Sequence, residues 1–320
     1  TNVPLDTSQT GDVVLSGHNV FTEIIIAEGT TVRGEGDEPL HLVSAGDMTI
    51  EGLIDVSGGD GQNASNDTVE PASGGMGVAG GGQGGFGGVL GDASDGIGDG
   101  AGGGGLKYST SSFGLGGGGA GYGSTGFRGG DYSAPSAYYG TAGPTYSGIY
   151  MDPLMAGSGG GGGSSAHTVV VPSVSTGSNG GGGGAGGGAV HIEALGTLTI
   201  TSTGEINADG GRGGNGVSGS SQAGAGGGAG SGGDIYLKAQ VMDNNGSVHA
   251  GGGSGGSGAH PYINGGAAGV GRVRVDAQML QVDGTEVSVS AFVITTTPSV
   301  GYFGLADYDG DGLDNETERD

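Results

Sequence analysis

The sequence predicts an all-β fold, a solenoid of stacked strands with glycine-rich insertions packed as polyglycine II helices. Three observations support this prediction. Short segments alternate apolar and polar residues, which is the pattern of a half-buried strand. These segments recur as copies of one unit. Glycine makes up 87 of the 320 residues, and its tracts stand at the same point of the copies, before the first strand.

The N-terminal residues 1–39 are expected to form a β cap made of the first rungs of the solenoid. They have the same texture as the rest, with short apolar runs at Val13–Leu15, Ile24–Ile26 and Thr30–Val32. Their sequence is atypical of the repeat, and atypical terminal repeats are the rule in solenoids.

The repeat itself is clearest where residues 40–50 align without a gap to residues 190–200. Each stretch is followed by glycine, an alternating strand and more glycine, as GLIDVSGG and as GEINADGG. A third copy begins at Ile235 and ends GSVHAGGG, and a fourth begins at Val273 and drifts into GTEVSVSA. Such strands cannot bury an apolar face alone, whereas stacked copies can, so the sequence predicts a solenoid.

This pattern divides the chain into four parts. The cap at 1–39 precedes a glycine-rich β-solenoid at 40–291, which contains a long insertion at 60–179. Residues 292–306 are expected to form a terminal strand and linker, and residues 307–320 a calcium-binding loop.

The glycine tracts have two interpretations. Glycine-rich chains can be flexible linkers, because glycine loses the most entropy on ordering. Alternatively, the tracts are extended polyglycine helices with three residues per turn, which approach closely because they lack Cβ atoms and bond laterally. We favour packing, because the tracts are in register with the strands.

Tyrosine is concentrated in and around the long insertion, together with two basic residues, Lys107 and Arg128. These tyrosines either pack against the glycine segments or form a contact surface for a sugar or another protein, since tyrosine combines contact area with a polar group. The residues are Tyr108, Tyr122, Tyr132, Tyr138, Tyr139, Tyr146 and Tyr150.

The stretch DYDGDGLDNETE at 307–318 fits the calcium-loop pattern D-x-[DN]-x-[DN]-G-x₅-E. Hard oxygen ligands at this spacing favour Ca²⁺ over a transition metal. The ligands would be Asp307, Asp309, Asp311, Leu313, Asn315 and Glu318. The flanking residues do not predict the helices of an EF-hand, and an acidic tail that binds calcium weakly is the alternative.

Three resemblances follow from these motifs. The GGAVHIEA, GTLTI and GEINADGG pattern resembles bacterial glycine-rich surface proteins of the adhesin type, which are built on a right-handed parallel β-helix. The acidic loop resembles a thrombospondin type 3 repeat. The glycine tracts are similar to those of phage-tip adhesins with packed polyglycine helices. Together the resemblances imply an extracellular, cell-surface protein of bacterial origin.

Composition excludes several other classes of protein. Eight Lys and Arg stand against 33 Asp and Glu, a formal net charge of −25, which disfavours nucleic acid and anionic membranes as partners. No apolar run is long enough to span a membrane. With no cysteine, disulfides and thiolate metal sites are excluded. Because the chain starts at Thr1 without methionine, we expect a processed chain or a fragment.

No catalytic constellation stands out. His41 and His191 share one repeat position, which Tyr236 and Arg274 occupy in later copies, so we expect outward-facing strand residues there rather than a catalytic pair. We expect no enzyme, but a secreted structural protein, a subunit of a calcium-stabilised extracellular filament or surface layer that assembles by stacking. Its partners would be further copies of itself, or neighbouring surface proteins and glycans. The alternative is a cell-surface adhesin or carbohydrate-binding module, and a polysaccharide-active β-helix enzyme ranks third.

Overall fold

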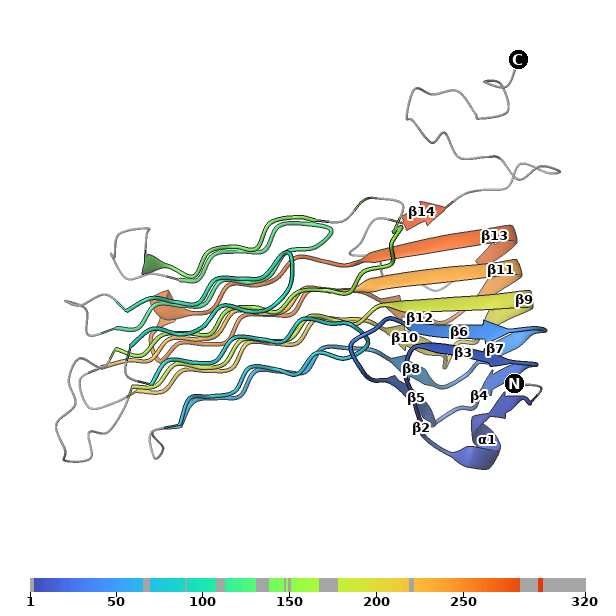
Figure 1. Cartoon of the computed structure of the whole chain (residues 1–320), viewed down its shortest axis with the longest axis horizontal. Coiled ribbons are helices and arrows are strands. Elements are labelled where there is room, and N and C mark those ends of the chain that lie inside the picture. The colour runs from blue at the N-terminus through green and yellow to red at the C-terminus, as the bar shows by residue number, and fades with distance from the viewer. Residues whose placement is uncertain are drawn as a thin grey trace, which may run out of the picture.

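The computed structural model has strands gathered at one end and long glycine-rich segments running side by side toward the other (Figure 1). We call the first part the base and the second the bundle. The structure describes residues 3–65, 70–89, 91–107, 113–130, 138–146, 148, 151–166, 178–218, 222–282 and 293–295.

The base consists of two β-sheets, and every pairing between the named strands is parallel. In the described part of the chain, sheet A has nine strands and sheet B has five. Sheet A contains β1 (Leu5–Asp6), β3 (His18–Phe21), β4 (Ile24–Ile26), β6 (Leu40–Ser44), β7 (Met48–Ile50), β9 (Val190–Ile200), β11 (Asp234–Asn244), β13 (Arg272–Val282) and β14 (Val293–Thr295). Sheet B contains β2 (Val13–Leu15), β5 (Thr31–Gly34), β8 (Leu53–Asp55), β10 (Glu205–Asn207) and β12 (Ser247–His249). Two short helices complete the elements, α1 (Thr7–Thr10) and the 3₁₀ helix η2 (Pro261–Ile263). The prediction of an all-β fold is confirmed.

Strand register follows the repeat that the sequence alignment predicts. β6 and β7 pair with β9 so that Leu40 lies opposite Val190 and Ile50 opposite Ile200, across the whole long insertion. Ile235 of the third copy pairs with Val190 and with Val273 of the fourth. The inward side chains of both sheets belong to one buried apolar cluster, and burial of that cluster stabilises the base.

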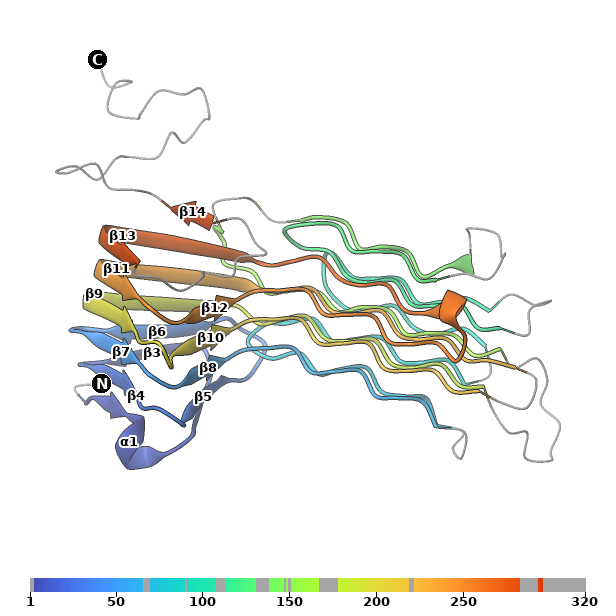
Figure 2. The ribbon, with the colours of Figure 1, turned by 180° about the vertical axis from the view of Figure 1, so that it is seen from behind.

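The segments of the bundle lie outside both sheets and are held by lateral backbone hydrogen bonds (Figure 2). In segment 180–188, three successive amides donate to three different neighbours, and this pattern repeats every three residues. The first neighbour is segment 82–88, which accepts from Gly180 (at Gly88), Gly183 (at Gly85) and Gly186 (at Gly82). The second is segment 225–231, which accepts from Gly181 (at Ala225), Gly184 (at Gly228) and Gly187 (at Ser231). The third is segment 56–62, which accepts from Gly182 (at Gln62), Ala185 (at Gly59) and Gly188 (at Val56), and all nine bonds are 2.7–3.0 Å long.

Segment 180–188 also accepts hydrogen bonds from three further neighbours, which are segments 157–163, 211–217 and the amide of Gly75. Six neighbours therefore surround it, and its residues are fully buried. A Cβ added at Gly181, Gly183 or Gly184 would lie closer than 3.0 Å to a neighbouring carbonyl oxygen. Glycine is required at these three positions because a side chain there would keep the backbones too far apart to bond, whereas Ala185 of the same segment is accommodated.

The outer segments lack neighbours on one side, and Asp and Asn side chains take over part of the bonding. Asp60 and Asn63 accept hydrogen bonds from the amides of Arg212 (2.7 Å) and Asn215 (2.8 Å). On another outer segment, Asp95 accepts one from the amide of Gly104 (2.7 Å). Asp92 does the same for the amide of Lys107 (2.5 Å), so two carboxylates of the acidic stretch 92–99 cap the bundle.

Candidate functional site

The predicted calcium ligands lie outside the described residues, so the loop at 307–318 stays a prediction. These are Asp307, Asp309, Asp311, Leu313, Asn315 and Glu318. In the part of the chain that the structure describes, no group of three or more His, Asp or Glu residues is arranged to hold a metal ion.

The tyrosines of the long insertion separate into two groups at opposite ends of the bundle. Tyr122 and Tyr146 lie where the bundle meets the base, and Tyr138 and Tyr139 lie at the far end. The remaining three, Tyr108, Tyr132 and Tyr150, are outside the described residues. Tyr122 is fully buried and Tyr146 is half-buried, so a contact surface made by described tyrosines depends on the far end.

The junction between bundle and base is built on a buried carboxyl group, Asp234, at the start of β11. Its Oδ2 accepts a hydrogen bond from the amide of Met155 (3.0 Å), and its side chain is fully buried. Burial raises the pKa of Asp234 to about 6, which the Tyr122 hydroxyl, the Met155 amide and the charge of Arg272 only partly offset. Arg272, the register partner of Asp234, lies 5.3 Å from the centre of the Tyr122 ring. This cluster joins the insertion to the strands.

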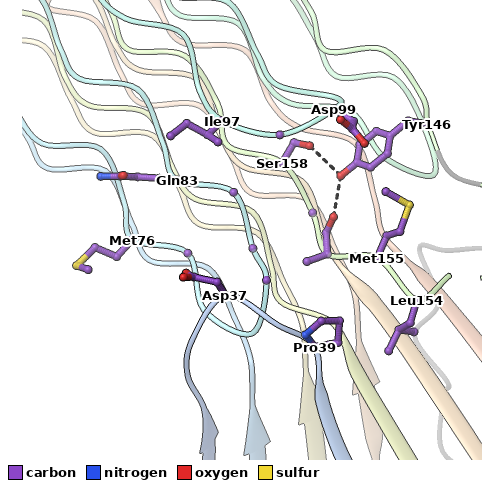
Figure 3. A pocket seen from close by; sticks show the side chains of 17 residues that line it. Asp37, Pro39, Met76, Gln83, Ile97, Asp99, Tyr146, Leu154, Met155 and Ser158 are labelled. Atoms are coloured by element: carbon purple, nitrogen blue, oxygen red, sulfur yellow. Dashed lines mark hydrogen bonds between the residues drawn. The ribbon is translucent and has the colours of Figure 1, made fainter. Parts of the chain in front are cut away.

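Beside the junction, the structure has a cavity of about 590 Å³. Figure 3 shows the carboxylates of Asp37 and Asp99 on different sides of it, with Met76 and Ile97 between them at its outer wall. Tyr146 closes the inner side: its hydroxyl donates to the carbonyl of Ala156 (2.7 Å) and accepts from the hydroxyl of Ser158 (2.8 Å). Burial raises the pKa of this phenol well above its usual value. The cavity is large enough for a small molecule.

The far end of the bundle carries a set of aromatic and basic side chains that we call the tip cluster. Its members are Lys107, Phe113, Arg128, Tyr138, Tyr139, His260 and Tyr262. The Arg128 guanidinium lies 5.1 Å from the centre of the Tyr139 ring. The His260 ring is 5.2 Å from both Phe113 and Tyr262. Figure 1 shows η2, in orange, at this end.

Backbone hydrogen bonds connect the segments that carry the members of the tip cluster. The amide of Leu106 donates to the carbonyl of Tyr138 (3.0 Å), and the amide of Gly130 donates to that of Asn264 (2.7 Å). Tyr262 is 59% exposed, and the nearby Phe127 is 66% exposed. The rigid bundle thus presents aromatic surface to solvent.

The charge of this region differs from that of the whole chain. The described residues of 100–107, 113–130, 138–146 and 250–271 include no Asp or Glu, although they include Lys107 and Arg128. These segments are neighbours in the bundle, since 114–120 bonds to 127–130, to 140–143 and to 266–269. The described residues of these segments therefore bring no carboxylate of their own, and the carboxylates of Asp95 and Asp92 border them at the amides of Gly104 and Lys107.

The repeat position of His41 and His191 forms a ladder of side chains across sheet A. His18, His41, His191, Tyr236 and Arg274 are register partners in turn. The rings of His191 and Tyr236 stack at 4.6 Å, and Arg274 lies 4.8 Å from the centre of the Tyr236 ring. Beside the ladder, Lys238 forms an ion pair with Glu193 (2.8 Å).

The sequence indicated the ladder correctly and the candidates Lys107, Arg128, Tyr138 and Tyr139, but not Asp234, the cavity or the tip-cluster members Phe113, His260 and Tyr262. In the sequence, Asp234 stands directly before the apolar residues of a strand, where an exposed polar residue is common. The tip cluster joins residues from separate glycine-rich stretches, and nothing in the sequence indicates that these stretches meet.

No protein-family model, curated protein or solved structure matches this chain. Among the described residues there is also no helix with the length and apolar character needed to cross a bilayer.

Proposed function

We propose that this chain is an extracellular binding module of the adhesin type, in which a rigid bundle presents the tip cluster to a carbohydrate. The observation that carries the proposal is the position of the aromatic and basic side chains at the end of the bundle away from the base. Tyrosine rings can pack against sugar rings while their hydroxyl groups bond to sugar hydroxyls.

The scaffold in this proposal is a right-handed β-solenoid that continues into a polyglycine II bundle. The chain runs from sheet A to sheet B within each copy and then returns to sheet A, and parallel crossovers are right-handed in nearly all proteins. The three-residue repeat of the hydrogen bonds supports polyglycine II, which has three residues per turn.

Charge suggests which carbohydrates would bind. A chain of net charge −25 repels acidic polymers at most of its surface. The members of the tip cluster include no carboxylate and include Lys107 and Arg128, although Asp92 lies beside Lys107. An arginine over a tyrosine ring provides a planar donor for a carboxylate or sulfate group. We therefore favour a glycan that carries such groups.

The test is a glycan array probed with the whole chain and with two arginine variants. Arg128→Ala removes the arginine of the tip cluster, and Arg33→Ala removes an exposed arginine of sheet B as a control with the same change of charge. We expect Arg128→Ala, and Tyr139→Ala likewise, to weaken binding to acidic glycans by about tenfold. Binding that is equal in Arg128→Ala and in the unchanged protein would refute the tip as the contact surface.

Calcium remains part of the proposal through the loop at 307–318, which would bind Ca²⁺ with Asp307, Asp309, Asp311, Leu313, Asn315 and Glu318. Extracellular calcium would occupy such a loop and order the end of the chain.

Assembly by stacking is a second candidate, favoured by exposed apolar residues on the first strands. Val14 of β2 is 55% exposed, Val20 of β3 is 39% exposed, and Val3 next to β1 is 52% exposed. Together they offer an apolar surface for another copy of the chain, and a contact of this head-to-tail kind extends into a filament. Sedimentation at rising concentration with Ca²⁺ tests it: a monomer throughout would exclude it, and a polymer lost in Val14→Ser would support it.

A further inference from the structure

The walls of the cavity beside the junction include two turns of the chain, and each turn carries a carboxylate. The turn that precedes β6 carries Asp37, and it is joined to the bundle by a hydrogen bond from the amide of Gly80 to the carbonyl of Gly36 (3.1 Å). The turn at 98–101 carries Asp99, and the amide of its last residue donates to the carbonyl of its first residue (3.2 Å). These bonds fix the backbone under both carboxylates, which face the cavity from different sides (Figure 3).

The described lining of the cavity is acidic and carries no positive charge. Asp37 and Asp99 are the charged side chains among the described residues that line it, and both are exposed. The charge of Asp99 also acts on the inner wall: burial raises the pKa of Tyr146, the Ser158 hydroxyl partly offsets this effect, and Asp99 raises the pKa further. A positively charged ligand is therefore favoured over a neutral or an acidic one.

Between the two carboxylates, the wall of the cavity is apolar. Met76 is 75% exposed and Ile97 is 59% exposed, so both side chains are open to contact with a ligand. Leu154 and Met155 add partly buried apolar surface, and methionine adapts its shape to what it contacts. The volume of about 590 Å³ lies in the usual range of small-molecule sites, about 300–1,000 Å³. A ligand that matches this wall has an apolar middle.

We propose that the cavity binds an aliphatic diamine. One ammonium group would pair with Asp37 and the other with Asp99, and the methylene chain between them would lie along Met76 and Ile97. A single metal ion fits less well, because the described residues contain no group of three His, Asp or Glu that could surround one. The site is separate from the tip cluster, which lies at the other end of the bundle, so it would bind its ligand whether or not the tip binds a glycan.

The experiment is a titration of the whole chain, isotope-labelled at its methionine and isoleucine methyl groups, followed by nuclear magnetic resonance. Salt at about 0.15 M screens the general attraction of an acidic protein for amines. Putrescine, a four-carbon diamine, should shift the methyl signals of Met76 and Ile97 in a saturable way, with a Kd in the millimolar range because exposed ion pairs are weak. Butylamine, with one ammonium group, should bind about fivefold more weakly, and butanediol, with none, should give no saturable shift.

Three variants test the two carboxylates separately. Asp37→Asn and Asp99→Asn should each weaken putrescine binding by about fivefold. Glu28→Gln removes an exposed carboxylate of the base outside the cavity lining, so this matched control should bind putrescine like the unchanged protein. Equal affinity for putrescine and butylamine, or equal losses in Asp37→Asn and Glu28→Gln, would overturn the proposal. So would the absence of any shift at Met76 and Ile97 in the unchanged protein, a result that does not depend on the variants folding.

Discussion

Replacing Gly184 with alanine tests whether the glycine segments are packed as tightly as their hydrogen bonds indicate. A Cβ at this position would lie 2.5 Å from the carbonyl carbon of Gly211 and closer still to its oxygen. Ordinary contact needs 3.4 Å or more, so the two segments must separate by more than about 0.9 Å, because the oxygen is closer than the carbon. Such a shift affects both backbone bonds of Gly184, to Gly228 and from Gly160, each 2.9 Å long.

The expected cost follows from these two effects. Overpacking a filled interior costs about 1–3 kcal/mol, and two weakened hydrogen bonds add about 1 kcal/mol each. We therefore expect Gly184→Ala to lower the free energy of unfolding by about 3–5 kcal/mol. For a chain of this size, that corresponds to a melting temperature lower by about 6 °C or more.

Gly251→Ala is the matched control in an outer segment. Its nearest neighbour would be the Asp209 carboxylate at 3.1 Å, a side-chain group that accepts a hydrogen bond from the Gly251 amide and needs to move by only a few tenths of an ångström. Alanine restricts the unfolded chain, so this variant should be neutral or more stable by up to about 1 kcal/mol. Urea denaturation and thermal melting followed by circular dichroism measure both. A Gly184→Ala protein as stable as the control would refute tight packing.

Three further predictions concern charge and metal. The pKa of Asp234 is about 6 in the folded chain and near 3.8 unfolded, so the folded state binds more protons and its stability falls as the pH rises from about 4 to about 6. Asp234→Asn removes this pH dependence. The free energy of unfolding of the variant, minus that of the unchanged protein, should therefore rise by up to about 3 kcal/mol between about pH 4 and pH 6. If urea denaturation gives the same difference at about pH 4 and pH 7.5, the raised pKa of Asp234 is wrong. Asp95→Ala removes the hydrogen-bond acceptor of the Gly104 amide and should lower the free energy of unfolding by about 1 kcal/mol. The control Asp37→Ala, at the exposed cavity wall, should lower it by less than about 0.5 kcal/mol. Equal losses of stability in thermal melting would contradict the capping role of Asp95. Calcium removal with a chelator should make residues 307–320 more sensitive to protease and leave the far-ultraviolet β-sheet signal intact, and loss of that signal would mean that calcium supports the whole fold.

Strand register could be predicted from the sequence because side chains encode it. Residues 40–50 and 190–200 carry the same alternation of apolar and polar residues, and a shift by one residue would turn the apolar set outward. The ladder that contains His41 and His191 follows from the same alignment.

The arrangement of the bundle could not be predicted in the same way, because glycine carries no side chain that marks one neighbour from another. Tyr122 and Tyr138 look equivalent in the sequence, yet one is buried at the junction and the other belongs to the tip cluster. The two tyrosines differ in burial because they lie at opposite ends of the glycine segments, and the sequence does not show where along the bundle each residue lies. The spacing of Asp and Asn by three residues, as at Asp60 and Asn63, was a readable sign of a three-residue period.

Amide hydrogen exchange of segment 180–188 tests the central claim most directly, which is that the glycine segments form a hydrogen-bonded scaffold. Each of these amides donates to a neighbouring carbonyl, so all of them should exchange slowly, with protection near that of the strands β9 and β11. A flexible linker would exchange at the rate of an unfolded peptide. Fast exchange throughout this segment, while the strands stay protected, would contradict the account and leave the tip cluster without its rigid support.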